Sequence, residues 1–178
     1  DVKKIMKKYK DKRLVFVPRE KKETSPSAHI FDTLKKVTDV LDPELKGISV
    51  LSYIQTPFTT TTTLEEAIYT LLLHDADASL TVQEITTNLY KRSATGVIPL
   101  NNQDNKFRTD FDVIYSDARA SFATKNDNVT KKNVLHHLGN KIVHFQINPG
   151  ETFFIGAKND LGIVSYISKL MSAGVAKP

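Results

Sequence analysis

The sequence predicts an α+β fold, in which a mostly antiparallel sheet packs with three or four helices and follows a basic, flexible N-terminal arm. Segments with apolar residues at helical spacing are interspersed with short β-branched segments. Turn formers such as Asn148-Pro149-Gly150 separate them, and the chain has no internal repeat. Lysine is concentrated in the first 22 residues, which sets this segment apart from the rest.

The basic arm holds almost all of the asymmetry in charge. Residues 1–22 contain ten basic side chains against three acidic ones, a net charge of +7, whereas the whole chain of 178 residues has +5. The remaining residues therefore carry a net charge of −2. We divide the chain into a basic arm and linker (1–26) and a single α+β domain (27–178), because this length accommodates one core.

The composition excludes several classes of protein. The chain has no cysteine, which rules out disulfides, thiol catalysis and cysteine-based metal sites. It also lacks an apolar run of about 20 residues, which a membrane-spanning helix requires. A cytosolic protein without a targeting segment is expected.

Helical spacing and end signals place the first elements. Val2, Ile5, Met6 and Tyr9 lie on one face of a short helix in the arm. After a charged linker, a helix begins near Ser27 and ends at Asp42-Pro43, and 48–54 reads as a strand. Two capping boxes follow, Thr63 with Glu66 and Thr81 with Glu84, which predict helices over 64–74 and 81–92.

The second half of the chain is predicted to be richer in strands. The alternation of apolar and polar residues slips near Asp117, which indicates a bulge or a turn in a long strand. A helix is expected to end at Gly139, and the final segment, 161–168, is either a strand or a short helix. The strands expected in this half are 96–100, 107–115, 141–147 and 151–157.

No residue pattern predicts catalysis or cofactor binding. The sequence has no dinucleotide fingerprint, phosphate-binding loop, nucleophile elbow or zinc-helix motif. His136-His137 with Asp127 invites a metal site, but adjacent helical residues point about 100° apart and rarely share one ligand. We therefore predict no catalytic residue, no metal and no cofactor, and a protein that is not an enzyme.

The arm is predicted to bind an anionic surface, because an apolar stripe surrounded by lysines is typical of helices that lie on membranes. The same cations would also bind phosphate backbones, so a nucleic acid or a neighbouring subunit is an alternative. Only Tyr9 and Phe16 could stack on bases, which favours a membrane or an acidic protein over RNA. The predicted surface-binding residues are Lys3, Lys4, Ile5, Met6, Lys7, Lys8, Tyr9, Lys10, Lys12 and Arg13.

An apolar patch in the linker is the predicted self-association segment. An exposed apolar strand can pair with the edge of another chain. The patch consists of Leu14, Val15, Phe16 and Val17.

The order of these features resembles that of the rhabdovirus matrix proteins, in particular the plant-infecting, cytorhabdovirus-like members. The resemblance rests on Lys3-Lys4-Ile5-Met6-Lys7-Lys8, on Thr56-Pro57-Phe58-Thr59-Thr60 and on the capped helix that starts with Leu64-Glu65-Glu66-Ala67-Ile68. It continues faintly to Phe111-Asp112-Val113-Ile114-Tyr115. The chain departs from the animal members at Pro26-Ser27-Ala28-His29, which lacks the last proline of a budding motif.

The resemblance implies a viral structural protein. Such a protein self-associates, condenses the helical nucleocapsid and bridges it to the inner face of the envelope. The implied partners are the viral nucleoprotein, further copies of the chain, the anionic inner leaflet and a viral glycoprotein tail. It would be located in the virion between envelope and nucleocapsid, and in the host cytoplasm and on its membranes. The turn Pro57, Phe58, Thr59 and Thr60 is expected to contact a protein. A viral RNA-binding protein of the movement or silencing-suppressor type is the alternative.

Overall fold

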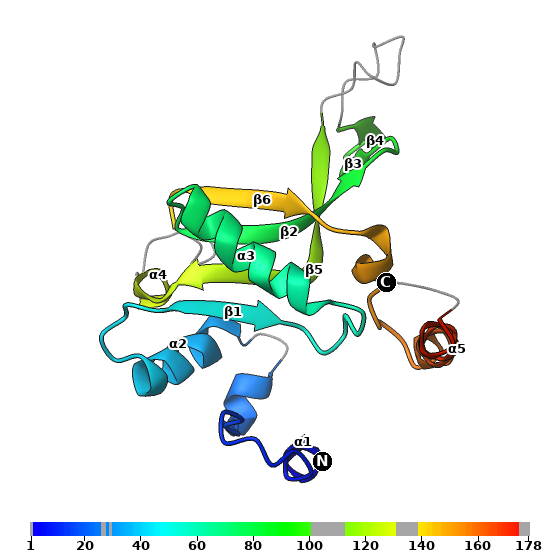
Figure 1. Ribbon diagram of the computed structural model, residues 1–178. Coiled ribbons are helices and arrows are strands. Elements are labelled where there is room, and N and C mark those ends of the chain that lie inside the picture. Colours follow the sequence, from blue (N-terminus) through cyan, green and yellow to red (C-terminus); the bar gives the residue numbers. More distant parts are fainter. Residues whose placement is uncertain (1, 26–27, 29, 101–112, 131–138, 175–178) are drawn as a thin grey trace.

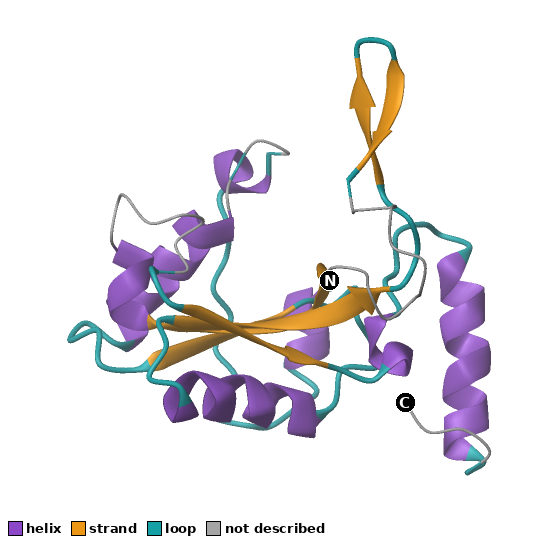
Figure 2. Cartoon of the chain, turned by 90° about the horizontal axis from the view of Figure 1, so that it is seen from above, coloured by secondary structure: helices purple, strands orange, loops and turns teal. Residues whose placement is uncertain are grey.

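The protein has the predicted α+β architecture. The computed structural model describes residues 2–25, 28, 30–100, 113–130 and 139–174. A four-stranded sheet carries helices on both faces, and a two-stranded hairpin projects from it (Figures 1 and 2). Within the described residues the α-helices are α1 (Val2–Met6), α2 (Ile30–Leu41), α3 (Thr61–Leu73), α4 (Asn126–Thr130) and α5 (Asp160–Ser172). The strands are β1 (Ile48–Ser52), β2 (Ala78–Ile85), β3 (Tyr90–Ser93), β4 (Gly96–Pro99), β5 (Ile114–Lys125) and β6 (Ile142–Gln146).

The larger sheet is mixed but mainly antiparallel. Its strand order is β1-β5-β2-β6, and β5 pairs antiparallel with both β1 and β2. Among the described strands, only β6 runs parallel to its neighbour, β2. The chain thus leaves β1 and β6 at the two edges of this sheet, and the β3–β4 hairpin forms the second sheet.

Successive side chains of β5 face opposite layers, which places helices on both sides of the sheet. Ala123 packs with Ala67 and Leu71 of α3, and all three are fully buried. Its neighbour Phe122 faces the other way and meets Phe31 of α2, with ring centroids 5.5 Å apart. The sheet is therefore the middle layer of three.

Helix α3 begins three residues earlier than the capping box predicts. Thr60 is its N-cap, and the Thr60 side chain accepts a hydrogen bond from the Thr63 backbone amide. The carboxylate at this terminus is Glu151, which is distant in sequence, rather than Glu66. The threonine run thus provides the N-cap from its own residues, whereas the carboxylate at this terminus comes from Glu151 and reaches it only in the folded chain.

The helix predicted over 81–92 is wrong, because Thr81 and Glu84 lie in strand β2. Thr81 and Val82 are buried between neighbouring strands, and Ala78, Ser79 and Leu80 pair with both β5 and β6. Long-range pairing of a β-branched segment overrides the local capping signal.

Two further expectations change at the C-terminal end. The strand expected over 151–157 is instead the end of a 3-10 turn, η4 (Pro149–Thr152), followed by extended chain outside the sheet. Of the two options for 161–168, the structure has the helix, α5. Most of the expected strand 107–115, the expected helix ending at Gly139, and the pair His136-His137 lie outside the described residues.

Asp42 joins the end of α2 to the start of β1 and to α4. Its Oδ2 accepts hydrogen bonds from the Gly47 backbone amide and from Asn126 Nδ2, each at 2.7 Å. Asn126 Oδ1 in turn accepts from the Ser49 hydroxyl at 2.6 Å. The hydrogen bonds to Asp42 lower the pKa of its carboxyl below the ordinary value, and the bond from Asn126 contributes more than the bond from Gly47.

This network predicts a loss of stability in acid. The folded-state pKa of Asp42 is below its unfolded value of about 3.9, so the stabilisation is present above that pH and is lost as the pH falls through the folded pKa. Urea midpoints measured between about pH 6 and pH 2.5 should fall less steeply for Asp42→Asn than for the unmodified chain. Equal pH slopes would contradict this assignment.

Candidate functional site

The arm lies on the surface and does not belong to the core. Helix α1 has no buried residue, and the apolar side chains Val2 and Ile5 are 55% and 53% exposed. Tyr9 is exposed, and Met6 is half-buried. Among the described residues, no carboxylate pairs with Lys4, Lys7 or Lys8, so these charges are available to a partner.

The arm has some internal order. Lys3 Nζ lies 5.7 Å from the centroid of the Phe16 ring, which brings α1 back towards the apolar patch. The Arg13 guanidinium donates to both oxygens of Asp11, and this contact lowers the pKa of Asp11 and raises that of Arg13. Within the described arm, Arg13 is thus the one predicted cation that is paired with a carboxylate, whereas Lys10 and Lys12 are simply exposed.

The predicted self-association patch is also accessible. Leu14, Val15 and Phe16 are exposed, and Val17 is half-buried. The patch has no strand partner among the described residues. After it, a 3-10 turn, η1 (Lys21–Thr24), is joined to α2 by ion pairs from Lys36 to Glu23 at 3.4 Å and to Glu20 at 3.9 Å.

The Pro57–Thr60 turn, by contrast, belongs largely to the fold. Phe58 is buried against Phe153, with ring centroids 6.1 Å apart, and Thr60 caps α3. Thr59 is half-buried and donates to the Thr56 carbonyl, which leaves Pro57 as the exposed member of the turn.

A bulge in β5 creates a second candidate site. Leu80 pairs with Phe122 and Val82 with Asp117, so that Thr81 alone lies opposite four residues of β5. The Thr81 hydroxyl bridges the gap, donating to the Ser121 carbonyl at 2.7 Å and accepting from its amide at 3.1 Å. The slip in alternation near Asp117 predicted this bulge, and the structure confirms it.

The bulge turns polar side chains towards a cleft. Arg119 has a left-handed backbone (φ 54°), and its amide donates to Asp117 Oδ1 at 2.8 Å. A non-glycine residue in this conformation is uncommon and is enriched at functional sites. Arg119 Cζ lies 5.3 Å from the centroid of the Phe154 ring. A cleft of about 330 Å³ is lined by Tyr53, Gln55, Asp117, Arg119 and Phe154.

The electrostatics of this bulge cleft are set by Tyr53, Asp117 and Arg119. Burial raises the pKa of the Tyr53 hydroxyl, and the negative charge of Asp117 acts in the same direction against that of Arg119. Tyr53 is therefore a hydrogen-bond donor at neutral pH. The described lining residues include no nucleophile beside a base, and no group of acidic and histidine side chains in the described chain is arranged to hold a metal. Sequence reasoning located the bulge but missed Tyr53, Gln55 and Phe154, for which the local sequence has no signal.

Comparisons with known proteins inform the fold alone. No family model matches the sequence, and no curated protein matches it. The structure is similar to a crystal structure of 4-diphosphocytidyl-2C-methyl-D-erythritol synthase from Anaerococcus prevotii, with a TM-score of 0.59 and 12% identity. The similarity covers 94% of this chain and 73% of that one. At this identity, it carries no information on what this chain binds or whether it catalyses a reaction.

None of the described helices is both long and apolar enough to cross a bilayer.

Proposed function

We propose that the chain is a non-enzymatic viral matrix protein that self-associates, condenses the helical nucleocapsid and links it to the inner face of the envelope. The observation that carries the proposal is the exposed arm, in which unpaired lysines and exposed apolar side chains occur together on α1 and in the turn that follows it. A segment whose lysines have no ion-pair partner and whose apolar side chains are exposed is suited to an anionic bilayer surface, because apolar burial and charge attraction both contribute to the binding free energy there.

The two aromatic residues of the arm favour lipid over RNA. Phe16 already has the Lys3 ammonium over its ring, which leaves Tyr9 as the exposed aromatic side chain free to stack on a base. Binding of single strands relies on several such stacking contacts. The exposed patch Leu14–Val17 is the proposed contact between copies, through pairing with a sheet edge.

Membrane binding through the arm predicts that each lysine removed from it weakens the binding. The double variant Lys7→Gln/Lys8→Gln removes two unpaired cations. Each cation contributes about 1 kcal/mol near an anionic leaflet, so affinity for phosphatidylserine vesicles should fall about 30-fold. Vesicle flotation with the full chain measures this loss.

A matched control removes two cations elsewhere. Lys91 and Arg92 are exposed on β3, in the projecting hairpin, and Lys91→Gln/Arg92→Gln should bind nearly as well as the unmodified chain. Equal losses in both double variants would show that total charge rather than the arm matters. Tight binding to single-stranded RNA at physiological salt, with no vesicle binding, would favour the RNA-binding alternative.

A further inference from the structure

Helix α5 is set apart from the rest of the fold. It stands beside the sheet instead of packing on it (Figures 1 and 2), and none of its side chains is buried. Its start is nevertheless well formed, because the Asp160 carboxylate accepts hydrogen bonds from the Gly156 and Ala157 amides at 2.8 and 2.7 Å. An isolated helix of 13 residues is marginal in water, so its apolar face calls for a partner.

One side of α5 is apolar and the other is polar. The apolar side chains recur at intervals of three and four residues, as on one helix face: Ile163, Val164, Tyr166, Ile167, Leu170 and Met171. Ile163 and Tyr166 are exposed, and the others are half-buried. The opposite side carries Ser165, Ser168, Lys169 and Ser172 together with the exposed Leu161 of the first turn, and a shallow hollow runs along it.

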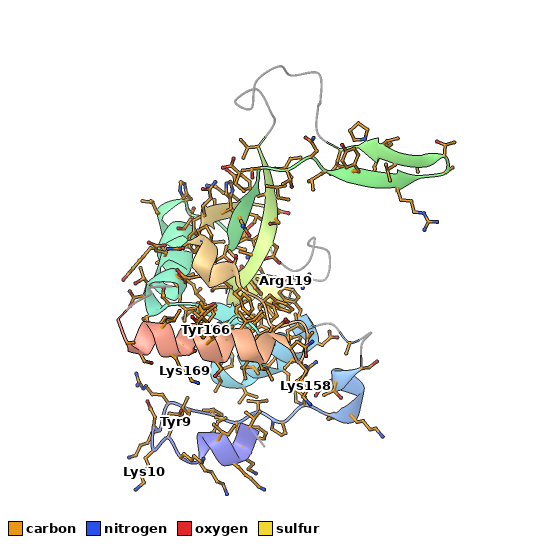
Figure 3. The ribbon with its side chains drawn as sticks, turned by 90° about the vertical axis from the view of Figure 1, so that its right-hand side faces the viewer. Tyr9, Lys10, Arg119, Lys158, Tyr166 and Lys169 are labelled. Carbon is orange, nitrogen blue, oxygen red and sulfur yellow. The ribbon has the colours of Figure 1, made fainter. Side chains whose placement is uncertain are left out.

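The charges around α5 favour an anionic partner. Lys158 precedes the helix and Lys169 lies in its last turn, whereas the charge of Asp160 is satisfied by backbone amides. Figure 3 shows Tyr166, Lys169, Lys158 and Arg119 on one side of the molecule, with Tyr9 and Lys10 of the arm below α5 in the same view. The cations of α5 and of the arm are thus seen together in this view, and both α1 and α5 carry exposed apolar residues.

We propose that α5 is a second membrane-binding element, which lies in the plane of an anionic bilayer with its apolar side in the interface. The helix is about 20 Å long, too short to cross a hydrocarbon core of about 30 Å, so it is suited to lying flat. Tyrosine, with an apolar ring and a polar hydroxyl, is suited to this depth. The inference rests on the proposed membrane function and assigns it a site outside the arm.

The absence of tryptophan from the chain allows each element to be probed by itself. Tyr166 of α5, Tyr9 of the arm and Tyr69 of α3 have nearly equal exposure, 65%, 65% and 64%. The full-length variants Tyr166→Trp, Tyr9→Trp and Tyr69→Trp therefore give single fluorophores that are matched in exposure. With phosphatidylserine vesicles, the emission of the Tyr166→Trp and Tyr9→Trp variants should shift to shorter wavelength and be quenched by lipids brominated in the acyl chains. The emission of the Tyr69→Trp variant should do neither.

The outcomes separate this inference from the proposed function. An emission shift at position 9 without one at position 166 overturns the α5 site but supports membrane binding by the arm. A shift at position 166 without one at position 9 supports the α5 site and overturns membrane binding by the arm. A shift at position 69 as well shows adsorption of unfolded chain, which overturns the proposal. A shift at 166 without vesicles that grows with protein concentration assigns the face to a second copy and also overturns it.

A binding measurement tests the apolar side directly. Ile163→Ser should weaken vesicle binding about tenfold or more, because the isoleucine side chain no longer enters the interface. Ile98→Ser on β4 is the matched control, an exposed isoleucine on the projecting hairpin, and should leave binding unchanged. Unchanged binding of Ile163→Ser would overturn the proposal.

Discussion

Replacing Gly139 by alanine is expected to lower the free energy of unfolding by about 3 kcal/mol or more. Gly139 is buried and has a φ of +89°, a region in which a side chain costs about 1–2 kcal/mol. A Cβ on Gly139 would lie 2.1 Å from Asp77 Cβ, so Asp77 must move. The Asp77 carboxylate accepts from the Asn140 and Lys141 amides at 2.7 and 3.0 Å, and these bonds start β6 at the sheet edge.

Substitutions at two other glycines distinguish the cost of a positive φ from the cost of overlap with Asp77. Gly96 also has a positive φ, +136°, but nothing lies within 4 Å of a Cβ there, so Gly96→Ala should cost about 1 kcal/mol. Gly162 lies inside α5 in open space, and Gly162→Ala should stabilise that helix by about 0.5–1 kcal/mol. Urea unfolding followed by circular dichroism ranks the three variants, and equal effects at positions 139 and 96 would contradict the overlap with Asp77.

Local sequence signals were sufficient where an element depends on its own residues. The helix predicted to begin near Ser27 and end at Asp42-Pro43 is α2, whose observed bounds are Ile30–Leu41. The slip in alternation at Asp117 locates the bulge because the side chains themselves change faces there. The exposed stripe of α1 was likewise visible in the sequence, since its apolar residues continue no pattern of the domain.

Local sequence patterns gave a wrong prediction or none where the residues that determine the structure are distant in the sequence. Thr81 with Glu84 has the form of a helix cap, but pairing with two strands holds this segment in the sheet. The bulge cleft joins Tyr53, Arg119 and Phe154 from three separate segments, and no local pattern connects them. The exposure of α5 was equally unpredictable, because an amphipathic segment near a chain end is normally assigned to the core.

Glu151 holds the segment that leads to α5 against the rest of the domain. Its side chain comes from η4 and is 7% exposed. The carboxylate accepts a hydrogen bond from the Thr60 amide at 2.9 Å and another from the Thr63 hydroxyl, and thereby covers the N-terminus of α3. A negative charge at this position also interacts favourably with the helix dipole.

Glu151→Ala should therefore cost about 3 kcal/mol, since hydrogen bonds to a charged group contribute about 1.5–3 kcal/mol each and the Thr63 hydroxyl would be left buried. Glu151→Gln keeps an acceptor oxygen but removes the charge, and we expect about half that loss. Glu65→Ala, an exposed acid in the first turns of α3, is the control and should change stability by no more than about 0.5 kcal/mol.

The same variant tests whether this anchor positions α5. Loss of the Glu151 contact loosens the chain from η4 to Asp160, although Phe153 still packs against Phe58 and Phe154 against the Arg119 guanidinium. In the Tyr166→Trp background, Glu151→Ala should therefore weaken the vesicle-induced emission shift at a temperature where the domain is still folded, because the chain that leads to α5 is held less firmly. A full shift in a destabilised but folded Glu151→Ala protein would show that Glu151 supports α3 alone and that α5 finds the membrane without it.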